Sequence, residues 1–112
     1  FLKLKKTFEE VCADIPDQNV RHGVMFEVPS ACYQADEIFE AADFASIGSN
    51  DLIQYFFAVD RNNELVAYDY NPERESFWKL LKSIADASKK TGKPLAVCGE
   101  IAGMPKLVAK LR

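Results

Sequence analysis

Short apolar runs alternate with helical segments along this chain, and this alternation restricts the fold more than any other feature. Three runs have the length and composition of strands: "GVMFEV" (23–28), "FASIG" (44–48) and "PLAVC" (94–98). Between and after them, apolar residues recur at helical spacing. A β-α-β-α-β-α order predicts a parallel sheet covered by helices, so the expected fold class is α/β.

Helix and loop signals place the connecting elements. Apolar spacing predicts helices over four segments: 7–15, 30–42, 51–57 and 104–111. Asn71 and Pro72 favour the start of a longer helix, and Gly92 favours its end. The segment 60–72, "DRNNELVAYDYNP", is predicted to be a long irregular loop.

Two architectures share this order of elements. An open doubly wound sheet can be built from slightly more chain than the 112 residues present. A (β/α)₈ TIM barrel needs about 250 residues, so this chain would be less than half of one. In both architectures, ligands bind at the carboxyl ends of the strands.

Composition argues against several classes of protein. Hydrophobic residues make up 48% of the chain, which is enough for a buried core. The 14 basic and 17 acidic residues give a net charge of -3, which argues against nucleic acid or an anionic membrane surface as the main partner. No apolar run approaches the roughly 18 residues of a membrane span, so membrane insertion is not expected. The three cysteines form no C-x-x-C pair, which disfavours a disulfide framework or zinc site and favours a cytoplasmic setting.

Polar side chains gather where the predicted strands end. Glu27 is near the end of the first strand, and Cys98 ends the third. Asn50 and Asp51 follow the second strand. Neighbouring parallel strands bring their ends to the same edge, so these four side chains are expected to lie together. His22 precedes the first strand and is expected at the opposite edge, as a structural or incidental residue and not a phosphoryl carrier.

Each of these polar residues has an ordinary explanation beside a functional one. Glu27 lies in a strand expected to be covered on both faces, so its carboxylate must be paired, metal-bound or at the solvent-exposed rim. Asn50 and Asp51 are typical helix caps, but they would also suit a ligand. Arg61 is either a solvated loop side chain or a planar fork for phosphate or carboxylate. Cys98 is either a small buried hydrophobe or a proton donor.

The same edge suits both a cation and an anion. With Asp51 arriving from the next strand, Glu27 gains a second carboxylate beside it, and two carboxylates suit Mg²⁺. Gly48 and Ser49 permit a tight bend at a helix start, where backbone N–H groups can hold an anion.

Three segments together resemble a known family. "GVMFEVPSA", "DFASIGSNDLIQYFFAVDRNNE" and "GKPLAVCGEIAG" are similar to the phosphoenolpyruvate (PEP)-binding TIM barrel of the PEP-utilising enzymes. The motif-bearing core is 23–103, and the whole chain, 1–112, is interpreted as one piece of that barrel domain. "AVDRNNE" and "CGEIAG" resemble the Enzyme I branch, the phosphoenolpyruvate-protein phosphotransferases of bacterial sugar transport, more than PEP synthase or pyruvate phosphate dikinase.

The resemblance implies a role for each residue at the edge. Glu27 and Asp51 would bind the Mg²⁺ that bridges to PEP. Asn50 and Arg61 would contact the phosphate of PEP, and the turn at Ser49 and Asn50 its carboxylate. The physics of phosphoryl transfer agrees, because that reaction depends mainly on positioning and charge neutralisation.

The resemblance also implies the reaction and its limits. Cys98 would protonate C3 of the enolate to give pyruvate, after the phosphoryl group passes to a histidine of the enzyme and on to a histidine-containing phosphocarrier protein. The family's earlier strands with further arginines, its closing strand and its histidine-bearing domain are all missing here. The chain therefore corresponds to about the fifth to seventh βα units of the barrel, and it is expected to be inactive alone.

Other interpretations stay open at this point. One is a fragment of PEP synthase or pyruvate phosphate dikinase, and another is a noncatalytic interaction module of the same fold. A partial barrel also exposes apolar strand edges, which predicts a homodimer or other self-association.

Overall fold

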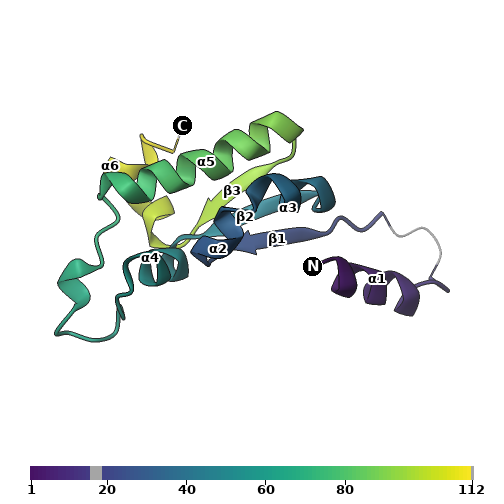
Figure 1. Ribbon diagram of the computed structural model, residues 1–112, viewed down its shortest axis with the longest axis horizontal. Coiled ribbons are helices and arrows are strands. Elements are labelled where there is room, and N and C mark those ends of the chain that lie inside the picture. Colours follow the sequence, from purple (N-terminus) through teal and green to yellow (C-terminus); the bar gives the residue numbers. More distant parts are fainter. Residues whose placement is uncertain (16–18, 112) are drawn as a thin grey trace.

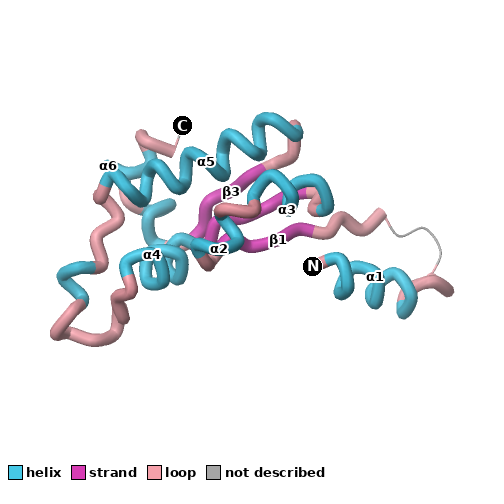
Figure 2. The backbone as a smooth tube through the Cα atoms, viewed as in Figure 1, coloured by secondary structure: helices cyan, strands magenta, loops and turns pink. Residues whose placement is uncertain are grey.

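The computed structural model describes residues 1–15 and 19–111. In chain order, the helices, 3₁₀ helices (η) and strands are α1 (Leu2–Val11), β1 (Gly23–Phe26), α2 (Pro29–Cys32), α3 (Ala35–Ala41), β2 (Phe44–Gly48), α4 (Ser49–Phe57), η1 (Ala67–Asp69), α5 (Glu75–Thr91), β3 (Leu95–Cys98), η2 (Glu100–Gly103) and α6 (Pro105–Val108). Strands alternate with helices along the chain (Figures 1 and 2). The expected α/β class is therefore confirmed.

The strands form one parallel sheet in the order β1-β2-β3. Phe26 is level with Ile47, and Ile47 with Val97. One residue further along, Gly48 is level with Cys98. Successive residues of a strand point to opposite faces of the sheet, so the first row lies on one face and the second row on the other.

Helices cover the face that carries Phe26 and Ile47. Helices α2, α3 and α5 pack next to one another over this face (Figure 1). On the opposite face, Met25 is 51% exposed, and Ala96 and Cys98 are exposed as well. The expectation that the first strand is covered on both faces was therefore wrong for the face that carries Met25.

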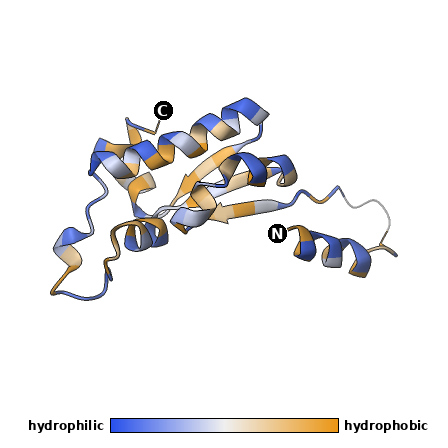
Figure 3. Ribbon diagram, in the orientation of Figure 1, coloured by the Kyte–Doolittle hydropathy of each residue, from blue (hydrophilic) through white to orange (hydrophobic). Residues whose placement is uncertain are grey.

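The hydrophobic core lies between the sheet and these helices. Helix α5 contributes Phe77 and Ile84, which are fully buried, and the rings of Phe26 and Phe39 lie 5.7 Å apart. Figure 3 shows hydrophobic strands, whereas the outer sides of α3 and α5 are hydrophilic. Gly92 ends α5 in the left-handed conformation, with φ of 68°, as its position in the sequence predicted.

Several predicted helix boundaries differ from the structure. The helix predicted over 7–15 is α1 at Leu2–Val11, and α4 begins two residues earlier than predicted. Helix α6 is shorter than the predicted 104–111. The single helix expected over 30–42 is two helices, α2 and α3, separated by a turn at Tyr33 and Gln34. Helix α5 begins at Glu75, a few residues after the Asn-Pro signal.

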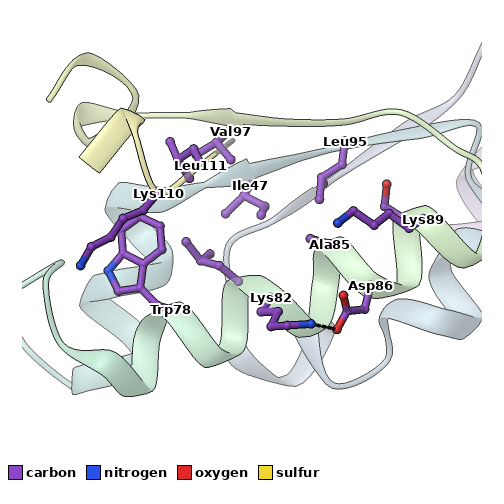
Figure 4. A pocket seen from close by; sticks show the side chains of 12 residues that line it. Ile47, Trp78, Lys82, Ala85, Asp86, Lys89, Leu95, Val97, Lys110 and Leu111 are labelled. Atoms are coloured by element: carbon purple, nitrogen blue, oxygen red, sulfur yellow. Dashed lines mark hydrogen bonds and ion pairs between the residues drawn. The ribbon is translucent and has the colours of Figure 1, made fainter. Parts of the chain in front are cut away.

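A hollow of about 380 Å³ lies between α5 and the helix-covered side of β3 (Figure 4). Trp78, Leu95 and Lys110 are among the side chains that line it, and the Lys110 ammonium lies 5.3 Å from the centre of the Trp78 ring. The hollow is on the face of the sheet opposite to the row containing Cys98.

The amino-terminal helix packs near the amino end of the sheet. The Phe8 ring meets the His22 ring edge to face at 5.0 Å, and the N–H of His22 donates to Asp43 Oδ2 at 2.7 Å. His22 thus precedes β1, at the edge opposite to Cys98, as expected. Among the described residues, no helix is long and apolar enough to cross a membrane.

Candidate active site

The carboxyl ends of the strands place Glu27, Gly48 and Cys98 in one row on the open face of the sheet. Glu27 follows Phe26, which pairs with Ile47, so Glu27 is level with Gly48. The Glu27 side chain leans across this glycine, because a Cβ built on Gly48 would lie 2.6 Å from Glu27 Oε1. Any side chain at position 48 would therefore displace the carboxylate.

Hydrogen bonds join the end of β3 to the start of α4. The Ser49 hydroxyl donates to the carbonyl oxygen of Cys98 at 2.6 Å, and the Glu100 N–H donates to Asn50 Oδ1 at 2.9 Å. Gly99 lies between the two bonded positions with φ of +89°, and a Cβ there would lie 2.8 Å from Asn50 Oδ1. Glycine therefore permits the close approach of the two segments.

Asn50 does not cap its helix. The N-cap position of α4 is Gly48, and no side chain caps this helix. The Asn50 side-chain oxygen is instead bonded to Glu100, and its amide N–H groups have no hydrogen-bond partner among the described residues. The capping explanation was therefore wrong for Asn50, and the amide suits an acceptor such as a phosphate or carboxylate oxygen.

Asp51 and Arg61 come together beside the first turn of α4. Arg61 Nη2 lies 3.8 Å from Asp51 Oδ1, with the two side chains 36% and 41% exposed. The N–H of Arg61 donates to Gln54 Oε1 at 3.3 Å, which ties the loop to α4. Such an exposed pair stabilises the fold by about 1 kcal/mol at most. The main consequence of the pair is that the Arg61 guanidinium lies at the same edge of the sheet as the Asn50 amide.

Tyr70 is a member of this cluster that the sequence did not indicate. Its hydroxyl donates to the carbonyl oxygen of Asn50 at 3.2 Å. Burial raises the pKa of Tyr70 above its ordinary value of 10.0, and the negative charge of Glu100 raises this pKa further, whereas the neighbouring Arg61 lowers it. The hydroxyl is therefore a protonated donor at neutral pH. The loop sequence contains two tyrosines, Tyr68 and Tyr70, and nothing in their spacing distinguishes them.

The cysteines occupy different environments. Cys98 is exposed, and its thiol donates to the carbonyl oxygen of Ile47 at 3.2 Å. Cys32 is buried, and burial raises the pKa of its thiol to about 11. The description of a small buried hydrophobe therefore fits Cys32 and is wrong for Cys98.

Glu27 and Asp51 are the two carboxylates predicted to bind a cation, and each follows a strand at the carboxyl end of the sheet. Across residues 1–15 and 19–111, no three His, Cys, Asp or Glu side chains are arranged to hold a metal ion by themselves. Magnesium usually takes one or two carboxylates and completes its coordination with water and substrate oxygens. The donor set therefore fits Mg²⁺ shared with an anionic ligand better than it fits a closed metal site.

The sequence matches a family model described as the PEP-binding domain of PEP-utilising enzymes, over residues 2–112. The chain belongs to this family. The chain is 46% identical over 101 residues to a phosphoenolpyruvate-protein phosphotransferase of Listeria monocytogenes. This alignment covers 90% of the chain and 17% of that protein. The chain is 48% identical over 87 residues to the protein of the same name in Haemophilus influenzae, covering 78% of the chain and 15% of that protein.

A third relative carries a different name. The chain is 41% identical over 108 residues to a multiphosphoryl transfer protein of Escherichia coli strain CFT073, which covers 91% of the chain and 13% of that protein. The chain thus spans between 13% and 17% of the length of these relatives.

Proposed function

We propose that this chain supplies part of the PEP- and Mg²⁺-binding site of a PEP-dependent phosphotransferase. That enzyme transfers the phosphoryl group of PEP to one of its own histidines and then to a histidine-containing phosphocarrier protein, with release of pyruvate. The observation that carries the proposal is the pair of hydrogen bonds that join Ser49 to Cys98 and Asn50 to Glu100. These bonds lie beside the Asp51–Arg61 pair, in a chain of the PEP-binding family. A cytoplasmic location is part of the proposal.

The proposed architecture is a TIM barrel of which this chain forms about the fifth to seventh βα units. Three features support it: parallel strands in sequential order, helices over one face, and site residues at the carboxyl ends. The open face with Met25 would be the barrel interior. The hollow beside β3 would receive a further helix.

In this proposal, the groups that bind the anion are all hydrogen-bond donors. The Asn50 amide offers its N–H groups and Arg61 its guanidinium to the phosphate of PEP. The Ser49 hydroxyl already donates to Cys98, so Ser49 would act through its main-chain N–H in the first turn of α4, toward the carboxylate of PEP. An anion with several acceptor oxygens matches this set.

Glu27 and Asp51 would hold Mg²⁺ against the bound substrate. When bound, the cation supplies charge neutralisation for the phosphate and the departing enolate oxygen. Glu27 would approach it from the end of β1, with its position set by Gly48. Asp51 would approach it from α4 while pairing with Arg61, which keeps the guanidinium next to the phosphate.

Cys98 would complete the conversion to pyruvate. When the phosphoryl group passes to histidine, the P–O bond of PEP breaks, an N–P bond forms and the enolate of pyruvate leaves. The Cys98 thiol then gives its proton to C3 of the enolate, and the resulting thiolate regains a proton from solvent. The exposure of the thiol on the open face, next to the bend at Ser49, supports this role.

A chimera tests the proposal. In the Listeria monocytogenes relative, the 101 matching residues are replaced by those of this chain, and pyruvate release from PEP and Mg²⁺ is measured. We expect the chimera to turn over PEP and the isolated 112-residue chain to show no pyruvate release or self-phosphorylation.

The matched variants in the chimera are Asp51→Asn and Asp86→Asn, because Asp86 lies in an exposed ion pair on α5. Losing a group that stabilises the transition state typically lowers kcat by about 100-fold or more. Asp51→Asn should lower the kcat of the chimera by this amount. Asp86→Asn should leave kcat unchanged. Full activity in Asp51→Asn, or robust turnover by the isolated chain, would contradict the proposal.

A further inference from the structure

Asn50 is held from two directions. From the end of β3, the Glu100 N–H donates to its side-chain oxygen at 2.9 Å. From the loop between α4 and α5, the Tyr70 hydroxyl donates to its main-chain oxygen at 3.2 Å. One contact fixes which end of the amide faces outward, and the other fixes the backbone that carries the amide.

Tyr70 lies in a segment that an ion pair and a cation–π contact hold in place. Its neighbour Asp69 pairs with Arg74 at 2.8 Å, and the Arg74 guanidinium lies 4.7 Å from the centre of the Phe57 ring, at the last residue of α4. The segment that carries Tyr70 is thus tied to the end of α4 and to the start of α5. Tyr68, two residues earlier, is 78% exposed.

We propose that Tyr70 is a positioning residue for the anionic substrate. Its hydroxyl holds the main chain of Asn50 so that the Asn50 amide and the neighbouring Arg61 are presented to the same ligand. The inference rests on the proposed function, because the ligand in question is the phosphate of PEP. Losing one such hydrogen bond typically shifts an equilibrium by about three- to tenfold, so a hydroxyl that never touches the substrate still affects its binding.

The first experiment uses the 112-residue chain and needs no ligand. Hydrogen exchange of the Glu100 amide is measured by NMR in wild type, Tyr70→Phe and Tyr68→Phe. Loss of one hydrogen bond corresponds to about a three- to tenfold change in an equilibrium. The Glu100 N–H should therefore exchange at least about threefold faster in Tyr70→Phe than in wild type. Its exchange rate should be unchanged in Tyr68→Phe. Unchanged exchange in Tyr70→Phe, or an equal change in both variants, would overturn the proposal.

The second experiment measures steady-state kinetics of the same two variants in the Listeria chimera. A positioning role predicts that Tyr70→Phe raises KM for PEP by about three- to tenfold with kcat within about twofold. Tyr68→Phe should change neither. A shifted Glu100 exchange with unchanged KM would overturn the link to the substrate while leaving the proposed function intact. A wild-type chimera without turnover would instead count against the proposed function, and the exchange measurement would still decide whether Tyr70 holds Asn50.

Discussion

At the scale of single residues, two glycines make room for the site. Glu27 fills the space over Gly48, and Ser49 and Asn50 fill the space beside Gly99. A side chain at either position would meet a proposed ligand-binding residue before it met anything else. Gly103 is different, because a Cβ built there has no heavy atom within 4 Å.

Substitution of Gly99 by alanine should therefore destabilise the fold. The variant combines a left-handed backbone conformation with a collision at Ser49 and Asn50, and such strain typically amounts to about 1–3 kcal/mol. Urea denaturation of the chain followed by circular dichroism measures it. Gly103→Ala is the matched control and should stay within about 0.5 kcal/mol of wild type. Equal stability of the two variants would show that the close approach at Gly99 is absent.

Sequence alone predicted some site residues for a definite physical reason. Parallel strands bring their ends to one edge, so Glu27, Asn50 and Cys98 could be placed together from the strand assignments. The contact of Tyr70 with Asn50 spans 20 positions and depends on how the loop folds back, which no local pattern encodes. Whether each residue binds PEP or Mg²⁺ stays a prediction.

At the scale of elements, local sequence patterns predicted a helix or strand boundary correctly where the residues concerned made no competing hydrogen bonds. Strand β2 and the glycine stop of α5 were predicted correctly. The Asn-Pro signal failed as a helix start because both residues have other partners: Asn71 Oδ1 accepts the N–H of Glu73 at 2.8 Å, and the Pro72 carbonyl accepts the Trp78 indole N–H at 2.8 Å. The Arg74 N–H donates to the Asn71 carbonyl oxygen at 3.5 Å, which closes a turn, and α5 begins only at Glu75.

The Asp43 carboxylate joins the residues that precede β1 and β2 at the amino end of the sheet, and its contribution to stability should depend on pH. The backbone N–H of His22 is the main cause that lowers the pKa of Asp43 below its ordinary value of 3.8. A lowered folded-state pKa means that the stabilisation is present above the unfolded pKa and is lost as pH falls through the folded value. Asp43→Asn should therefore be less stable than wild type near neutral pH, and the difference should shrink below pH 3.8. Urea denaturation across this range measures it, and a difference independent of pH would contradict the assignment.

At the scale of the whole molecule, the described chain buries one face of its sheet and leaves the other open. Strands β1 and β3 are the edges of this sheet, and edge strands with unpaired backbone groups favour association. Apolar side chains add to the exposed surface, among them Met25 on the open face and Leu4 on α1, which is 75% exposed. A second copy of the chain would cover such surfaces where other parts of a barrel do not.

The isolated chain should therefore self-associate in solution. Light scattering after size-exclusion chromatography should give a mass above the 12.6 kDa of one chain, rising with protein concentration. Met25→Lys places a charge on the open face and should shift the equilibrium toward monomer, since burying an unpaired charge at an interface is unfavourable. Tyr33→Lys is the matched control, because Tyr33 is 81% exposed next to α2 on the helix-covered side. A compact monomer at every concentration, or equal effects of the two lysines, would show that the open face is not the surface of association.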